Sequence, residues 1–92
     1  MSQDLKWDET VLKKFNLMIQ KMPLFHRRIA EDLARNKAEA NAKERKSNIV
    51  QEMDVVKAFF SEVPKPFYSL MIRLMENVGF DYKEFALNQK IK

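Results

Sequence analysis

The chain of 92 residues contains no cysteine, a single glycine and three prolines. The absence of cysteine excludes a disulfide framework, a thiolate nucleophile and a cysteine-ligated iron–sulfur cluster. So few glycines and prolines leave little material for tight β-hairpins, and the apolar residues never alternate with period two for more than a few positions. These absences favour an all-α fold.

Long apolar runs are absent as well. The uncharged apolar stretches are far shorter than the roughly 20 residues of a transmembrane helix, and the N-terminal sequence lacks the basic start and apolar block of a signal peptide. With 46% apolar and 33% charged residues, the composition is typical of a folded chain with a water-exposed surface. We therefore expect a single helical domain over residues 1–92, no membrane contact and a cytoplasmic location.

The first predicted helix spans residues 9–22. Asp8 is its expected N-cap, and Trp7 is expected to fold back on Leu12 as a hydrophobic staple. Pro23 has no backbone donor and suits the first turn of a second helix, so we place a break there. The apolar residues that recur at helical spacing in the first helix are Val11, Leu12, Phe15, Met18, Ile19 and Met22.

A long helix is predicted over about residues 24–46. Phe25, Ile29 and Leu33 form its apolar stripe, and alanines dominate its second half, where they combine high helix propensity with little bulk. These small side chains either allow another helix to approach closely or face water, and we favour the close approach. Because this half buries little area alone, we expect a homodimer or a complex with a protein partner.

Three shorter helices are expected in the rest of the chain. Ile49 and Val50 form an extended pair, and a third helix follows from about residue 52, with Asp54 in its first turn where a carboxylate interacts favourably with the helix dipole. The proline-rich segment 63–66 ends this helix.

A fourth helix over about residues 66–78 is expected to stop at Gly79 in a left-handed conformation. A capping box of Asp81 and Glu84 predicts a fifth helix over 82–89. The fold class predicted for the chain is therefore all-α, with about five helices.

The helical phases also predict which side chains are buried. On the third helix these are Met53, Val55, Val56, Phe59 and Phe60, and on the fourth they are Phe67, Leu70, Met71, Leu74, Met75 and Val78. The central members of the predicted core are Phe25, Ile29, Leu33, Phe60 and Leu74.

No set of residues in the sequence predicts a catalytic or metal site. His26 is the only histidine, and with no cysteine it supplies at most one strong metal ligand. Nothing near it in the sequence provides the partner that a general base needs. The carboxylates of the long helix, such as Glu31 and Glu39, have basic residues at helical spacing and look like a solvated face. We expect no catalytic residue, no metal, no cofactor and no enzymatic activity.

Basic residues gather at both ends of the long helix and are the candidate nucleic-acid contacts. The two groups lie about 27 Å apart at 1.5 Å per residue, so one copy cannot join them. An antiparallel crossing of two long helices in a homodimer would join the start of one helix to the end of the other, as phosphate binding requires. Basic residues are also expected at a helix C-terminus because of the dipole, and with a net charge of only +4 we favour that interpretation. The candidates are Arg27, Arg28, Lys43, Arg45 and Lys46.

Residues 9–62 resemble the histone fold. The resemblance lies in the short, long, short order of the helices and in the pattern of Val50, Asp54, Val55 and Ala58 around the second loop and third helix. This resemblance implies a DNA-binding homodimer, which we keep as the alternative function.

A closer resemblance, over residues 7–62, is to the small helical domain at the C-terminus of the B subunit of light-independent protochlorophyllide reductase. It rests on Trp7, the turn at residues 22–25, Arg27 and the segment VQEMDVVKA. The helices over 66–89 are additional to it. In that family cysteine-held iron–sulfur clusters of the large subunits carry the redox chemistry, so the resemblance implies an accessory, protein-interaction role here. The matching candidates for partner contact are Trp7, Phe25 and Arg27.

Overall fold

Four helices, a two-stranded parallel sheet and one 3₁₀ turn form in the part of the chain that the computed structural model describes, residues 5–83. The chain is therefore mostly helical rather than all-α. In chain order the elements are β1 (Lys6–Trp7), α1 (Glu9–Gln20), α2 (Leu24–Glu44), β2 (Ile49–Val50), α3 (Glu52–Glu62), the 3₁₀ turn η1 (Lys65–Phe67) and α4 (Tyr68–Val78). The fifth helix predicted over 82–89 falls almost entirely outside the described residues.

The helix ends follow local capping chemistry. The Asp8 carboxylate accepts hydrogen bonds from the backbone amides of Thr10 and Val11 at 2.9 and 3.1 Å, so the predicted N-cap of α1 is confirmed. Gly79 ends α4 with φ of 91°, and both its amide and that of Phe80 donate to the carbonyl of Met75. The predicted left-handed stop is confirmed too.

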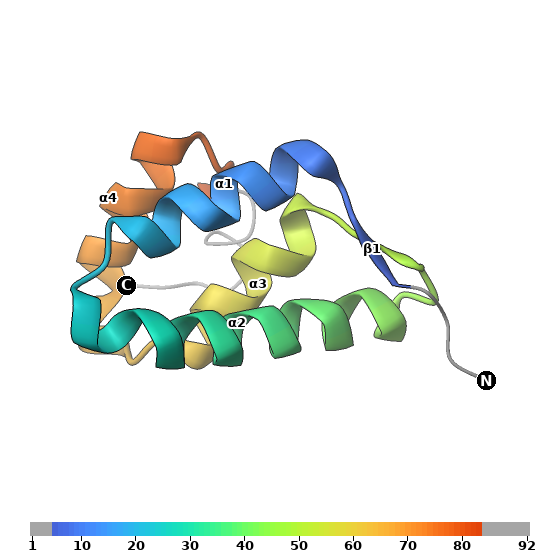
Figure 1. The fold of residues 1–92 in the computed structure, drawn as a ribbon, viewed down its shortest axis with the longest axis horizontal. Helices are drawn as coiled ribbons and strands as arrows, with labels where there is room; N and C mark the ends of the chain where they lie inside the picture. The colour runs from blue at the N-terminus through green and yellow to red at the C-terminus, as the bar shows by residue number, and fades with distance from the viewer. Residues whose placement is uncertain (1–4, 84–92) are drawn as a thin grey trace.

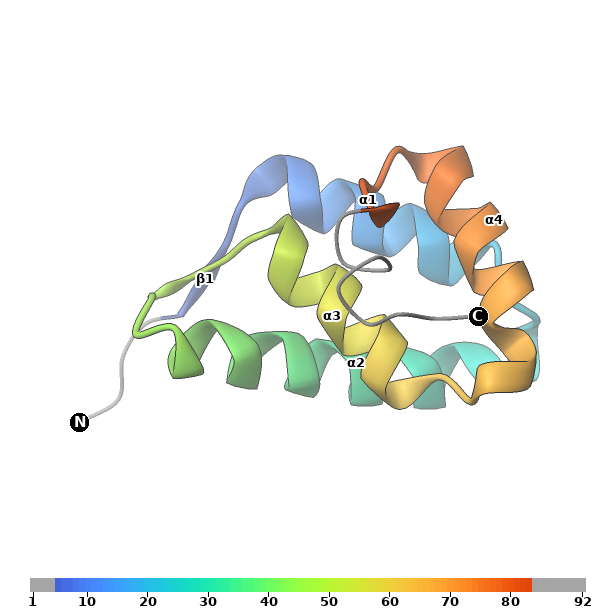
Figure 2. The same cartoon turned by 180° about the vertical axis from the view of Figure 1, so that it is seen from behind.

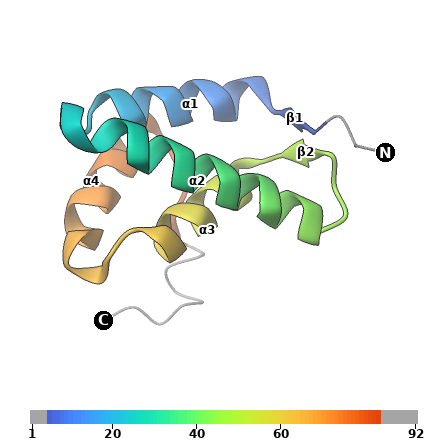
Figure 3. The ribbon, with the colours of Figure 1, turned by 60° about the horizontal axis from the view of Figure 1, so that its bottom comes forward.

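The small sheet joins the start of α1 to the loop between α2 and α3. Lys6 pairs with Ile49 and Trp7 with Val50 in parallel register. The sequence predicted the extended pair at Ile49 and Val50 but not its partner strand, because the pairing links segments more than 40 residues apart. Figure 3 shows β1 and β2 side by side, at the opposite end of the molecule from α4.

The core lies where α1, α2 and α4 surround α3. In Figure 1, α1 and α2 run along the long axis on either side of α3, and α4 stands at the end where α1 turns into α2. Figure 2 shows the same arrangement from behind. The largest apolar side chains that are almost completely buried are Phe15, Phe59, Met18, Met75, Val50, Val55 and Val56.

Alanines form the contact between α2 and α3. Ala34, Ala38 and Ala42 recur every four residues on one face of α2, and all three are buried. Small side chains let the two helix backbones approach closely, so the predicted close approach is confirmed.

Several burial predictions are wrong. Phe25, Ile29 and Leu33 remain 77%, 62% and 47% exposed, because α3 covers the alanine face of α2 and leaves the stripe of large residues uncovered. Phe60 and Leu74 are buried as predicted. Met53, Phe67 and Leu70, also expected in the core, are exposed.

Among the described residues, the structure contains no helix with both the length and the apolar character needed to cross a membrane.

Candidate functional site

An apolar groove of about 520 Å³ lies between α2 and α4, and we take it as the candidate site. One wall is the first half of α2, and the other is η1 with α4, while the end of α3 closes one side. Five large apolar side chains on its walls are exposed to solvent, and we call them the apolar face: Phe25, Ile29, Leu33, Phe67 and Leu70.

Hydrogen bonds to backbone carbonyls hold both walls of the groove in place. Arg27 donates from Nε to the carbonyl of Met22 at 3.0 Å and from Nη2 to that of Gln20 at 2.5 Å, which ties the start of α2 to the end of α1. On the other wall, the hydroxyl of Tyr68 donates to the carbonyl of Phe60 at 2.5 Å and its ring packs edge-on against the Phe60 ring. The groove is therefore built before any partner binds.

Polar chemistry is sparse in this groove. His26 and Glu62 are its titratable lining residues, and the His26 ring packs against Phe25 with centroids 4.1 Å apart. No group of three or more metal-ligating side chains gathers among residues 5–83. Apolar walls with a few polar groups at the margin are suited to taking apolar side chains rather than to acid–base chemistry.

The three residues matched to the reductase-domain resemblance do not form one site. Phe25 and Arg27 lie together at the start of α2, with Phe25 on the groove wall and Arg27 bonded to the α1 end. Trp7 lies in β1, against the second half of α2. Their shared role in partner contact stays a prediction.

Trp7 has partners of its own within the fold. Its Nε1 donates to a Glu39 carboxylate oxygen at 3.0 Å, and its ring centroid lies 5.1 Å from that of Phe15. The guanidinium of Arg35 sits 5.3 Å from the Trp7 centroid. These contacts place Trp7 in a cluster that joins β1, α1 and α2, and the staple contact expected with Leu12 stays a prediction.

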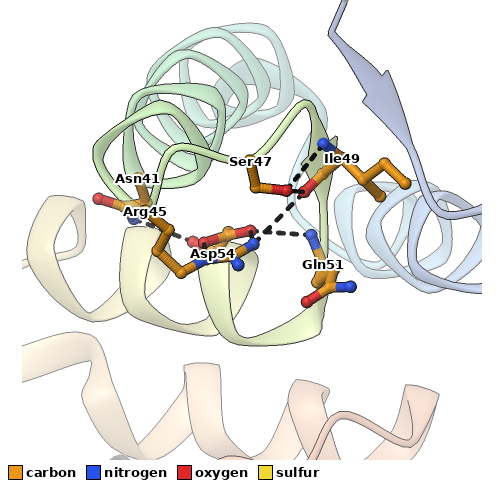
Figure 4. Close-up of polar contacts among 6 residues, drawn as sticks. All are labelled: Asn41, Arg45, Ser47, Ile49, Gln51 and Asp54. Carbon is orange, nitrogen blue, oxygen red and sulfur yellow. Dashed lines mark hydrogen bonds and ion pairs between the residues drawn. The ribbon is translucent and has the colours of Figure 1, made fainter.

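Arg45, one of the candidate DNA contacts, forms an ion pair with a buried carboxylate (Figure 4). Its Nε and Nη2 donate to the two Asp54 carboxylate oxygens at 2.9 and 2.6 Å. This hydrogen bonding and the negative charge of Asp54 raise the pKa of Arg45 above its usual value. The Asp54 carboxylate also accepts from the backbone amide of Gln51 at 2.9 Å, and Asn41 donates to the Asp54 carbonyl. Together these contacts join the end of α2 to the start of α3.

The remaining basic candidates are more accessible. Arg28, Lys43 and Lys46 are exposed, and Lys46 adopts a left-handed backbone conformation with φ of 63° just after α2. Arg28 lies at the start of α2 and the two lysines at its end, so one copy keeps them apart, as the helix length predicted. Their binding to nucleic acid stays a prediction.

The apolar face was missed because its members were assigned to the core. The signal that would have found it is the four-residue spacing of Ala34, Ala38 and Ala42, which marks a second, smaller face on α2. A helix with both a small-residue face and a large-residue stripe has to leave one of them uncovered when a single neighbour packs on it.

Comparisons with models of protein families, with curated proteins and with solved structures find no match for this chain. Its function therefore has to be inferred from the chemistry of the site.

Proposed function

We propose that this chain is a non-enzymatic accessory module that docks on a protein through the apolar face. The observation that carries the proposal is the exposure of five large apolar side chains around one groove. Their exposed parts amount to roughly 500 Å² of apolar surface, given that an aromatic side chain has about 150–250 Å² to bury. A contiguous patch of this size on a small protein is typical of an interaction site.

The rigidity of the groove also supports docking. Arg27 fixes the α2 wall and Tyr68 fixes the wall formed by η1 and α4. A groove that is already shaped loses little conformational entropy when a partner binds, so more of the contact energy is available for affinity. An accessory role is also what the resemblance to the protochlorophyllide reductase B-subunit domain implies, and Phe25 belongs both to that resemblance and to the groove.

Site-specific photocrosslinking in the native cell tests the proposal. A photoreactive residue at Phe25 or Phe67 should give covalent adducts with a protein, whereas the same residue at Met53, which is exposed on α3 and away from the groove lining, should not. The protein identified in the adduct should bind the purified chain, and Ile29→Asp should weaken that binding at least about tenfold. Adducts that are equally strong at all three positions, or binding that Ile29→Asp leaves unchanged, would contradict the proposal.

A histone-like DNA-binding homodimer remains the second candidate, and it has less support. Two of its five candidate residues already have partners, since Arg27 holds the end of α1 and Arg45 holds Asp54. The cations left exposed at the end of α2 are Lys43 and Lys46. DNA affinity at cellular salt depends on the number of phosphates neutralised, so few free cations imply weak binding.

A further inference from the structure

We infer that the partner of the apolar face is a second copy of this chain, packed with its α2 antiparallel to the first and with Ile29 at the two-fold axis. The inference rests on the proposed function, because it names the occupant of the same face. Shape, area and charge support it independently.

The first half of α2 carries a ridge of large, exposed apolar side chains whose shape suits packing against a second copy. Phe25, Ile29 and Leu33 follow each other at intervals of four residues, so they form one row along the helix. A two-fold axis at Ile29 places Phe25 of each copy opposite Leu33 of the other, because both lie four residues from the axis. The same row then meets itself, as an isologous interface requires. In Figure 3, α2 runs across the front of the molecule, and no other described element passes in front of it.

The exposed area of the apolar face can be compared with the area that a specific dimer interface buries. Each copy exposes roughly 500 Å² on the apolar face, so a dimer that covers all five of its side chains in both copies buries about 1,000 Å² before any polar rim is counted. That total reaches the lower limit for a specific interface between proteins. The expected dimer is therefore a weak or transient one.

The flank of the ridge that faces away from the groove carries complementary charges. Arg28 and Asp32 lie on this flank one turn apart, both are exposed, and within residues 5–83 neither takes part in an ion pair. In the antiparallel arrangement, Arg28 of each copy lies beside Asp32 of the other, displaced by about 3 Å along the helix axis at 1.5 Å per residue. Two opposite-charge pairs thus form on the same side of the interface.

Charge exchange between two variants tests this geometry in analytical ultracentrifugation. Arg28→Glu alone sets two carboxylates against each other at each pair, and Asp32→Arg alone sets two guanidinium groups against each other. Each variant should form its homodimer about tenfold more weakly than the wild type. An equimolar mixture of the two should restore dimers. In the mixed dimer the introduced carboxylate of one variant meets the introduced guanidinium of the other, and the unchanged Asp32 of the first meets the unchanged Arg28 of the second.

A second pair of variants tests the apolar ridge. Ile29→Asp should produce a monomer, because it places a carboxylate at the centre of the interface. Met53→Asp changes a residue of similar exposure, 59% against 62%, outside the groove and should remain dimeric. Circular dichroism should show native helicity for both variants, since both positions are exposed.

The outcomes decide between self-association and another partner. A wild-type chain that stays monomeric, an Ile29→Asp variant that still dimerises, or a mixture that fails to restore dimers would overturn this inference. If the wild type is monomeric but Ile29→Asp abolishes binding to a different protein found by crosslinking at Phe25, the inference fails and the proposed function stands. If neither a second copy nor another protein binds the face, both fail.

Discussion

Asp54 is a carboxylate with only 2% of its side chain exposed, and Arg45 is the charge that compensates it. Its two oxygens together accept three hydrogen bonds, two from Arg45 and one from the backbone of Gln51. Removing the guanidinium leaves a buried negative charge with one backbone donor. A buried charge without its partner strongly favours unfolding.

The first prediction concerns the ion pair of Arg45 with Asp54. Arg45→Met should lower the free energy of unfolding by about 2–3 kcal/mol, somewhat less than for a fully buried pair because the Arg45 side chain is 32% exposed. Lys43→Met, a change of a neighbouring exposed cation, should stay within about 0.5 kcal/mol. Urea unfolding followed by circular dichroism measures both. Equal effects of the two changes would show that the ion pair contributes nothing specific.

The contacts that hold Trp7 in the fold are with residues that are not its neighbours in the sequence. Its indole bonds to Glu39, which is 32 positions away, and its ring packs on Phe15. Periodicity in the sequence pointed only to Leu12, because a staple is a local motif. The indole anchors β1 to α2, and whether it also contacts a partner is a separate prediction.

Among the helices and strands, α2 has two faces that differ in burial. The alanine face packs on α3, and the row of Phe25, Ile29 and Leu33 stays in solvent. Helix periodicity pointed to the row of large residues as the buried face, although the alanine row recurs at helical spacing too. It could not decide which one is covered, because that depends on which helix packs nearby and how closely its backbone approaches.

The second prediction contrasts a buried with an exposed phenylalanine. Phe60→Ala should lower the free energy of unfolding by about 3–5 kcal/mol, because it removes a buried ring that packs against Tyr68. Phe25→Ala should change it by less than about 0.5 kcal/mol at protein concentrations too low for association. Thermal and urea unfolding of both variants give the comparison. A large cost for Phe25→Ala in the dilute monomer would mean that α2 is turned by part of a turn from the described orientation.

At the scale of the whole molecule, the five candidate DNA contacts are divided between the two ends of α2. Arg27 and Arg45 at these ends are engaged in the fold, which leaves Arg28 at one end and the two lysines Lys43 and Lys46 at the other, too far apart for all three to act together in one copy. The antiparallel dimer inferred above joins the two first halves of α2. It therefore does not bring the lysines at the end of one helix beside the arginines at the start of the other.

The third prediction is that the chain does not bind DNA usefully. Titration with short duplex DNA near physiological salt should show no saturable binding at micromolar concentration, because few phosphates can be neutralised together. The matched variant is Lys43→Gln with Lys46→Gln, which leaves Arg45 and its structural ion pair intact. Saturable binding that this double variant loses, with a salt slope reduced by about 0.9 for each phosphate contact removed, would instead support the histone-like alternative.

The amino-acid sequence alone specified the four described helices and the caps of two of them. Helix α1 begins at Asp8 and α4 ends at Gly79 because the capping interactions involve residues within one turn of each other. The break at Pro23 and the extended pair at Ile49 and Val50 are likewise local. Such features depend on the conformation of a few neighbouring residues and on their side chains, so the sequence is enough to predict them.

Which surfaces are covered depends on the tertiary structure. The pairing of β1 with β2, the ion pair of Arg45 with Asp54, and the exposure of Phe25 each depend on segments that meet through the fold. Hydrophobic burial has no direction of its own, so a helix with two apolar rows satisfies its local pattern whichever row is inside. Because the alanines of α2 allow α3 to approach closely, the alanine row is buried in the core. The row of large residues stays exposed and is the candidate docking surface.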